Sequence, residues 1–157
     1  MLIAVSGTPG TGKTTVAMWL AKKLNLDYIS LNKFSREEEL ICGRDTKRCV
    51  DEVDIDRLKR KKFEKAVLDG HFSHLLKTDI TIILRRHPAL LEKRLEERGW
   101  KKEKIRENCE AEAMGIIAEE AGRDAYEIVS DENVLSNALK AVTGELQRVH
   151  YDFSDWL

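Results

Sequence analysis

The stretch Gly7-Thr-Pro-Gly-Thr-Gly-Lys-Thr14 determines how this chain of 157 residues folds and what it binds. It matches the pattern Gly-x-x-x-x-Gly-Lys-Ser/Thr at every position. The apolar run Leu2–Val5 precedes it, and apolar residues at helical spacing follow from Lys13 to Leu24. A strand, a glycine-rich turn and a helix in this order predict a phosphate-binding loop, because the backbone N–H groups face inward and the helix N-terminus is positive.

Each polar residue of this loop has an expected role toward a nucleoside triphosphate. Gly10 and Gly12 let the backbone curl around the phosphates, and Lys13 supplies a mobile cation for the β- and γ-phosphates. The Thr14 hydroxyl is the expected Mg²⁺ ligand, and Thr15 is expected to donate toward the α-phosphate. The pattern therefore predicts a site for ATP and Mg²⁺.

Strands and helices are expected to alternate along the chain. The apolar runs predict strands over residues 2–5, 27–30, 66–69, 80–84 and 126–129. Helical spacing predicts helices over residues 13–24, 34–42, 55–65, 88–98, 102–121 and 134–149, with a polar stretch at 44–54 and a tail at 150–157 that frays. This alternation predicts one α/β domain over residues 1–157, with a parallel sheet covered on both faces.

The composition excludes several other classes of protein. Apolar residues make up 42% of the chain, and 27 Lys and Arg nearly balance 28 Asp and Glu, which argues against a disordered polyelectrolyte. No apolar run approaches the ~20 residues needed to cross a bilayer, so a cytoplasmic protein without membrane contact is expected. Cys42 and Cys49 could form a disulfide, although reduced thiols, with Cys109, are the plainer expectation.

The charges are unevenly distributed along the chain. Residues 85–106 carry nine basic and four acidic side chains, whereas residues 107–157 carry three and twelve. The basic middle could receive polyphosphate or RNA; alternatively, these charged helices simply solvate themselves.

A second carboxylate is expected beside the loop. Val67-Leu68-Asp69 has the apolar-then-acid form of a Walker B strand, whose terminal Asp69 can hold Mg²⁺ directly or through water. His71 could orient an attacking water or contact a phosphate, or it could be an ordinary turn residue. His71 and His74 have a spacing that zinc sites use, but no third ligand lies nearby in the sequence.

Four arginines are candidates for gripping the transferred group and its acceptor, since phosphoryl transfer depends on positioning and charge neutralisation. Arg85 follows the expected strand 80–84, and Arg94 and Arg98 share one helical face. Arg36 is the candidate for holding the acceptor. Each of these side chains could instead be a solvated helix charge. The basic stretch 99–106 has the size of a lid over ATP.

Four blocks, taken in order, resemble one family: residues 7–15, Arg36-Glu37-Glu38, Asp69-Gly70-His71 and Arg94–Trp100. They are similar to the archaeal and eukaryotic adenylate kinase family that includes the coilin-interacting nuclear ATPase. The resemblance implies a nucleoside monophosphate kinase fold with a five-stranded parallel sheet of order 2-3-1-4-5. It also implies a monophosphate-binding region at about residues 28–51 and a short lid at about residues 98–108.

The resemblance implies a function as well. Members of the family make two ADP from ATP and AMP, hydrolyse ATP, and assist late maturation of the small ribosomal subunit by binding one of its proteins. By match, Arg98 contacts ATP from the lid edge, and Asp69 and His71 form the family's Asp-x-His element. Two alternatives stay open: an assembly ATPase that docks on rRNA through the basic run 57–65, and a kinase of another small acceptor.

Overall fold

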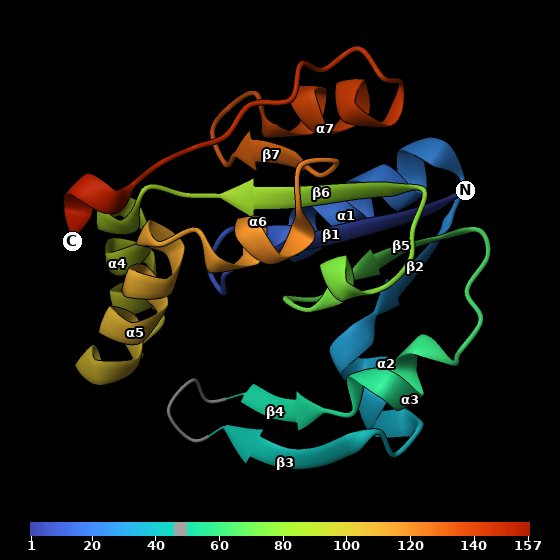
Figure 1. Ribbon diagram of the computed structural model, residues 1–157, viewed down its shortest axis with the longest axis horizontal. Helices are drawn as coiled ribbons and strands as arrows, with labels where there is room; N and C mark the ends of the chain where they lie inside the picture. Colours follow the sequence, from blue (N-terminus) through green and yellow to red (C-terminus); the bar gives the residue numbers. More distant parts are fainter. Residues whose placement is uncertain (46–49) are drawn as a thin grey trace.

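The computed structural model describes residues 1–45 and 50–157, and a five-stranded parallel sheet lies at its centre (Figure 1). Its strands are β1 (Leu2–Gly7), β2 (Asp27–Ser30), β5 (Ala66–Asp69), β6 (Ile80–Arg85) and β7 (Tyr126–Val129). They lie in the order β2-β5-β1-β6-β7. Numbered within the sheet, this is the order 2-3-1-4-5 that the resemblance implied, so that expectation is confirmed.

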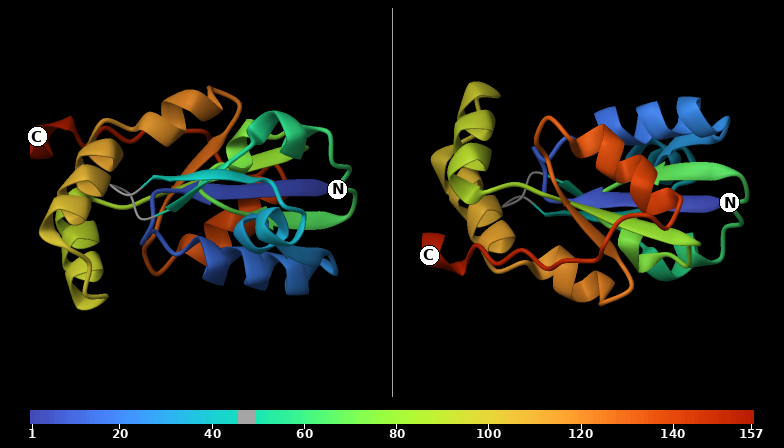
Figure 2. Two further views of the ribbon diagram at one scale, coloured as in Figure 1. Left: turned by 90° about the horizontal axis from the view of Figure 1, so that it is seen from below. Right: turned by 90° about the horizontal axis from the view of Figure 1, so that it is seen from above.

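Helices cover both faces of the sheet (Figure 2). Helix α1 (Lys13–Leu24) and helix α7 (Val134–Val142) pack on one face, where Leu20 and Ala138 are fully buried against the strands. Helix α6 (Ile116–Ala121) and the short helix η1 (Ser73–Leu75) cover the other face. Because helices cover both faces, the central strands β1, β5 and β6 are mostly apolar rather than alternating, whereas the edge strands β2 and β7 also contain polar residues.

The register of the parallel strands brings their carboxyl ends to one edge. Asp69 pairs with Val5 and with Ser30, and Gly7 pairs with Leu84. The glycine-rich loop therefore leaves the sheet beside the end of β5 and the end of β6. In open α/β sheets, ligands bind at this carboxyl edge, where neighbouring connections diverge.

The helix expected at residues 102–121 is two helices. Helix α4 (Pro88–Glu97) packs against α5 (Lys102–Ala113), and their contact is an apolar cluster of Leu91, Leu95, Ile105 and Cys109. The chain then turns at Gly115, whose φ of 64° is left-handed, before α6 begins. The single long helix was wrong because periodicity continues across a glycine that reverses the chain.

The region after β2 also differs from expectation. Helix α2 (Leu31–Glu37) begins earlier than predicted because Ser30 caps it, its side chain accepting from the Lys33 N–H. The residues expected to end that helix and to form a polar stretch instead form an antiparallel hairpin of β3 (Ile41–Asp45) and β4 (Val50–Val53). Helix α3 (Ile55–Lys59) follows and is shorter than the predicted 55–65.

The carboxyl-terminal tail does not fray. Helix α7 ends at Val142, short of the expected 149, and the chain crosses the ends of β7 and β6 to a short helix η2 (Ser154–Trp156) beside α5. Trp156 packs against the apolar cluster between α4 and α5. Aromatic side chains in an otherwise polar tail supply the contacts that order it.

Two further findings concern membranes and thiols. Within the described residues, no helix combines the length and apolarity needed to traverse a bilayer. Cys42 and Cys109 are free thiols, and Cys49, the expected alternative partner of Cys42, lies outside the described residues.

Candidate nucleotide site

The backbone of the loop at residues 7–14 requires glycine at two close approaches. A Cβ on Gly7 would lie 2.7 Å from the Leu84 carbonyl oxygen, and a Cβ on Gly10 would lie 2.8 Å from Leu91 Cδ1. Gly10 also has a φ of 92°. The loop is therefore pressed between strand β6 and helix α4, with a curvature that other residues do not readily adopt.

The amino terminus of α1 is open toward the loop. Gly12 precedes the helix with a φ of 90°, no side chain caps the helix, and its first turn contains no acidic residue. The first N–H groups of a helix lack partners within the helix, so here they can serve an anion. A nest of N–H groups at a positive helix end is a phosphate site.

Lys13 lies within this cradle. Its Nζ donates to the Thr8 carbonyl oxygen over 3.3 Å. Burial lowers the pKa of Lys13 to about 8; the Arg98 charge also lowers it, while the carboxylates of Asp69 and Glu112 oppose that shift. A desolvated ammonium group gains most from a phosphate that replaces its lost hydration.

The expected metal ligands are in mutual contact. The Thr14 hydroxyl donates to Asp69 Oδ2 over 2.8 Å, and the Tyr28 hydroxyl donates to the same oxygen over 2.6 Å. Burial and the hydrogen bond to Asp69 raise the pKa of Tyr28 to about 12, so the phenol stays a donor. Tyr28 was not identified from the sequence, because only pairing of β2 with β5 brings it to Asp69.

These oxygen donors fit Mg²⁺. That ion binds proteins through one or two carboxylates, with phosphates and water completing its coordination. Thr14 and Asp69 offer a hydroxyl and a carboxylate of this kind.

A basic cavity of about 420 Å³ lies on helix α4. Arg94 and Arg98 line it, as expected, together with Arg86 and the side chains of Leu90, Lys93 and Glu97. The Nε atom of Arg86 is buried and has no hydrogen-bond partner among the described residues. Burial and the charges of Arg94 and Arg98 lower the pKa of Arg86. Four cationic side chains and a single carboxylate line this cavity, and this excess of positive charge with an orphaned donor indicates an anion site.

Arg85 is not available to this cavity, which corrects its predicted role. Its side chain is 1% exposed and is bound by the carboxylates of Glu112 and Glu127. Consecutive residues at a strand end point in opposite directions, so Arg86 faces the cavity and Arg85 faces the interior. The double arginine at 85–86 was the available signal, but the sequence alone does not determine which member faces which side.

The remaining candidate residues lie around the same edge. Thr15 is exposed in the first turn of α1, and Arg36 is exposed in the last turn of α2. His71 is half-buried just beyond β5, with its ring edge-on to Phe72 at 4.9 Å.

His74 is engaged elsewhere. Its Nδ1 lies 2.8 Å from the Ser6 hydroxyl and its Nε2 lies 2.8 Å from a Glu120 carboxylate oxygen. Both ring nitrogens therefore have protein partners, which leaves no basis for a zinc site at His71 and His74.

Comparison with known proteins places this geometry in a family. A family model described as an AAA domain matches residues 3–115. A "Putative adenylate kinase" of Pyrococcus abyssi is 44% identical over 151 residues, covering 93% of this chain and 82% of that protein. A "Putative adenylate kinase" of Methanosarcina acetivorans is 36% identical and covers 100% of this chain and 98% of the relative.

Solved structures share the fold at much lower identity. The deoxyadenosine kinase of M. mycoides with bound dATP superposes with a TM-score of 0.59 at 15% identity, covering 92% of this chain and 98% of that chain. This likeness shows a common architecture and carries no information on the acceptor.

Proposed function

Because this chain belongs to the family of archaeal proteins named "Putative adenylate kinase" and has the α/β fold of P-loop kinases, we propose that it transfers the γ-phosphoryl group of ATP to AMP, yielding two ADP. The observation that carries the proposal is the open loop at residues 7–14, which holds the half-buried ammonium of Lys13, with the basic cavity of Arg86, Arg94 and Arg98 on the adjoining helix α4. These features suit a donor triphosphate and a second phosphate group.

Different residues are assigned to the phosphoryl donor, to the migrating group and to the acceptor. The acceptor phosphate is already an anionic nucleophile, so no strong base is required. Lys13 holds the β- and γ-phosphates, and Arg94 and Arg98 offset the charge that spreads over the migrating group. We add Arg86 to this set in place of Arg85, and we assign Arg36 to the acceptor.

The proposal also includes a Mg²⁺ site and a competing hydrolysis of ATP. When bound, Mg²⁺ neutralises charge on the β- and γ-phosphates, and Thr14 and Asp69 would hold it. His71, two residues after Asp69 in sequence, is the candidate to orient water for the ATPase reaction that the resemblance implies. The His71→Gly variant should then lose more hydrolysis than transfer, whereas equal losses would make His71 a structural residue.

The acceptor assignment is tested by a panel of nucleoside monophosphates with ATP, with ADP formation measured separately from phosphate release. We expect AMP to give the highest transfer. The Arg36→Ala variant should raise the KM for AMP about tenfold or more and leave the KM for ATP nearly unchanged, since the role assigned to Arg36 is toward the acceptor and not toward ATP.

Arg57→Ala is the matched control, because Arg57 is also an exposed helical arginine of this region and donates to the Glu39 carbonyl. Equal changes in both KM values for Arg36→Ala, or the same pattern in Arg57→Ala, would contradict the assigned role. No ADP from any monophosphate, with hydrolysis intact, would contradict the kinase proposal itself.

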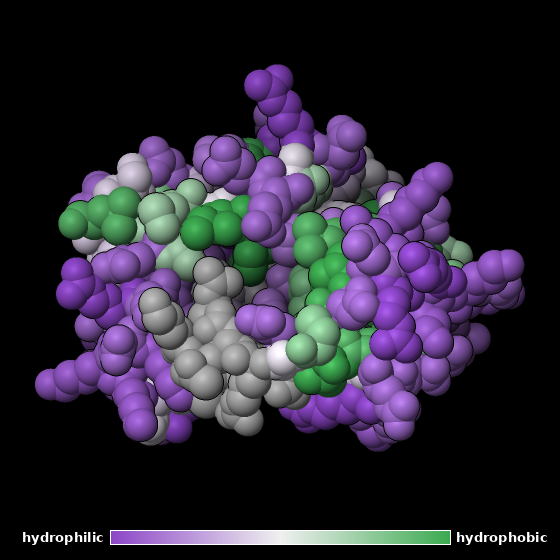
Figure 3. Space-filling model, turned by 60° about the horizontal axis from the view of Figure 1, so that its bottom comes forward, coloured by the Kyte–Doolittle hydropathy of each residue, from purple (hydrophilic) through white to green (hydrophobic). Residues whose placement is uncertain are grey.

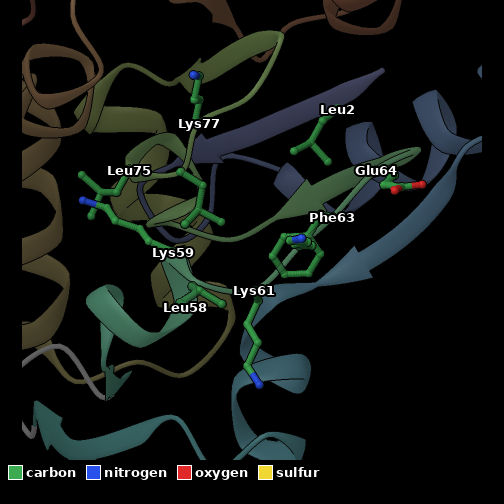
Figure 4. Close-up of a pocket in the computed structure, with 10 residues that line it drawn as sticks. Leu2, Leu58, Lys59, Lys61, Phe63, Glu64, Leu75 and Lys77 are labelled. Carbon is green, nitrogen blue, oxygen red and sulfur yellow. The ribbon is translucent and has the colours of Figure 1, made fainter.

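We also propose, as a second function, a role in maturation of the small ribosomal subunit through rRNA or a subunit protein. A cleft of about 600 Å³ supports it, with lysines around an apolar floor (Figure 4). Its basic residues are Lys59, Lys61, Lys62 and Lys77. Leu2 lines the same cleft and begins β1, whereas the phosphate loop follows the other end of that strand, so both sites can be occupied together.

Binding of small-subunit rRNA with and without an ATP analogue tests the second function. We expect the double variant Lys59→Ala, Lys62→Ala to weaken binding and to flatten its salt dependence, because each phosphate contact releases counterions. The control is the double variant Lys22→Ala, Lys23→Ala, because both of these lysines are exposed on α1. An rRNA affinity that changes neither with the ATP analogue nor with the loss of the two cleft lysines would refute this role.

A further inference from the structure

A buried carboxylate joins the phosphate loop to helix α5. Glu112, near the end of α5, is 3% exposed. Its Oε2 accepts from the Thr8 hydroxyl over 2.6 Å, and its Oε1 accepts from Arg85 Nε and from the Arg86 N–H, each over 2.9 Å. Thr8 lies 104 positions earlier in the chain, inside the loop that curls around the anion site.

Thr8 links Glu112 to Lys13, because its hydroxyl contacts the former and its carbonyl oxygen contacts the latter. The Thr8 carbonyl oxygen accepts from the Thr11 N–H over 3.2 Å, from the Thr11 hydroxyl over 2.7 Å and from Lys13 Nζ over 3.3 Å. A hydrogen bond that fixes the Thr8 side chain therefore also orients the carbonyl on which the ammonium group rests. Glu112 itself has no hydrogen bond to Lys13 among the described contacts, so it acts on the loop rather than on a phosphate.

The charge of Glu112 is matched inside the protein. Arg85 donates to Glu112 through Nε and to the Glu112 carbonyl through Nη2, and it also binds Glu127. A buried ion pair costs desolvation that well-packed apolar residues would avoid, so it contributes little to stability overall. Its value lies in fixed geometry, since each oxygen of the carboxylate is committed to a different segment.

We propose that Glu112 is a positioning residue for the phosphoryl donor, holding the loop through Thr8 in the shape that receives the triphosphate. This inference rests on the proposed function for its kinetic readout. It names a residue outside every motif that the sequence presented. Because α5 begins in the segment expected to close over ATP, the same carboxylate ties the loop to that segment.

The Thr8→Val variant tests the proposal with the least disturbance, because it keeps the shape of Thr8 and leaves the pair of Arg85 and Glu112 intact. We expect the KM for ATP to rise about tenfold, since displacement of about 1 Å can cost far more than that in rate. The KM for AMP should stay within about twofold, and the Thr8→Ser variant should restore most of the loss, since its hydroxyl can still donate.

A matched control and a second variant complete the design. Thr143→Val removes an exposed hydroxyl that donates only to the Lys140 carbonyl, and it should change neither KM. The Glu112→Gln variant keeps one acceptor oxygen and replaces the other with an amide NH2 group. That group then faces a hydrogen-bond donor, on Arg85 or on Thr8. Where this variant folds, it should raise the KM for ATP as Thr8→Val does.

Two results would overturn the proposal. One is an unchanged KM for ATP in Thr8→Val, including the case in which only the melting temperature falls, because that is what a merely structural residue produces. The other is an equal loss in the Val and Ser variants. If the wild-type chain binds a non-hydrolysable ATP analogue but transfers to no monophosphate, the kinase proposal fails. The calorimetric Kd of that analogue for Thr8→Val then still decides the role of Glu112.

Discussion

At the scale of residues, contacts of single side chains define the candidate site: Lys13 donates to the Thr8 carbonyl oxygen, and Thr14 donates to Asp69. Lys13 and Thr14 belong to the loop motif, which carries its own backbone geometry, whereas Asp69 lies 55 positions from Thr14 and was indicated by the apolar-then-acid form of its own strand. The sequence indicated Arg85 for the transferred group, whereas Arg86 lines the basic cavity in the structure. Whether Arg85 or Arg86 enters the interior depends on Glu112 and Glu127, which lie on elements far along the chain. No local pattern contains that information.

Lys13 should make ATP use dependent on pH. Its pKa of about 8 in the free protein means that the ammonium form, which binds phosphate, declines above that pH. A bound triphosphate stabilises the charge and raises the pKa again, so binding at higher pH must take up a proton. We therefore expect kcat/KM for ATP to be level below pH 8 and to fall by up to about tenfold per pH unit above it.

The measurement is a pH profile of kcat/KM for ATP, with Lys22→Ala as the control. Lys22 is exposed in the last turn of α1 and should leave the profile unaltered. A profile that stays level to pH 10 would show that burial does not govern this lysine.

At the scale of elements, helices and strands with regular apolar spacing were predicted well, and turns that depend on distant contacts were not. The strands of the main sheet and helices α1 and α4 lie where the pattern placed them. The hairpin β3–β4 was missed because its strands are short and polar and are stabilised by each other. Figure 3 shows the face at the bottom of Figure 1 turned forward. Hydrophilic side chains cover most of this face, and apolar residues gather beside a hollow in it.

Gly10 makes the loop and helix α4 depend on each other. In the Gly10→Ala variant, the new methyl would meet Leu91 and Leu95 at a φ of 92°. Left-handed strain and overpacking together should lower the free energy of unfolding by about 2–5 kcal/mol. ATP binding should weaken as the loop moves away from α4. Thermal denaturation and calorimetry measure the two effects.

The Gly122→Ala variant separates strain from contact. Gly122 has a φ of 81° and a ψ of −179°, a conformation almost exclusive to glycine, but nothing lies within 4 Å of its added Cβ, so only backbone strain of about 1–3 kcal/mol applies. If both variants lose the same stability and both bind ATP normally, the packing of α4 on the loop has no energetic role.

At the scale of the whole molecule, the carboxyl-terminal tail packs on the buried Arg85 and on helices α4 and α5. The Tyr151 carbonyl accepts from Arg85 over 3.0 Å, and the Phe153 ring lies 5.1 Å from its guanidinium carbon. Trp156 then packs between α4 and α5. The tail was expected to fray, but its aromatic rings pack on the assembled surface around Arg85 and helices α4 and α5, which the local sequence does not contain.

Removal of residues 150–157 should therefore destabilise the protein. The loss of three partly buried aromatic rings and a hydrogen bond to Arg85 should lower the melting temperature by on the order of 10 °C. Removal of Leu157 alone is the control, since that side chain is 65% exposed. An unchanged melting temperature after the larger deletion would mean that the tail contributes nothing to the fold.

The central claim is that residues 7–14 hold the triphosphate of the phosphoryl donor. Its most direct measurement is the calorimetric Kd of a non-hydrolysable ATP analogue with Mg²⁺ for the wild-type chain and for Lys13→Ala, with circular dichroism to confirm that both are folded. We predict that the wild-type chain binds the analogue and that Lys13→Ala binds it about a hundredfold more weakly, because a buried charge-assisted contact is lost. Equal affinity in the two folded proteins would contradict the claim.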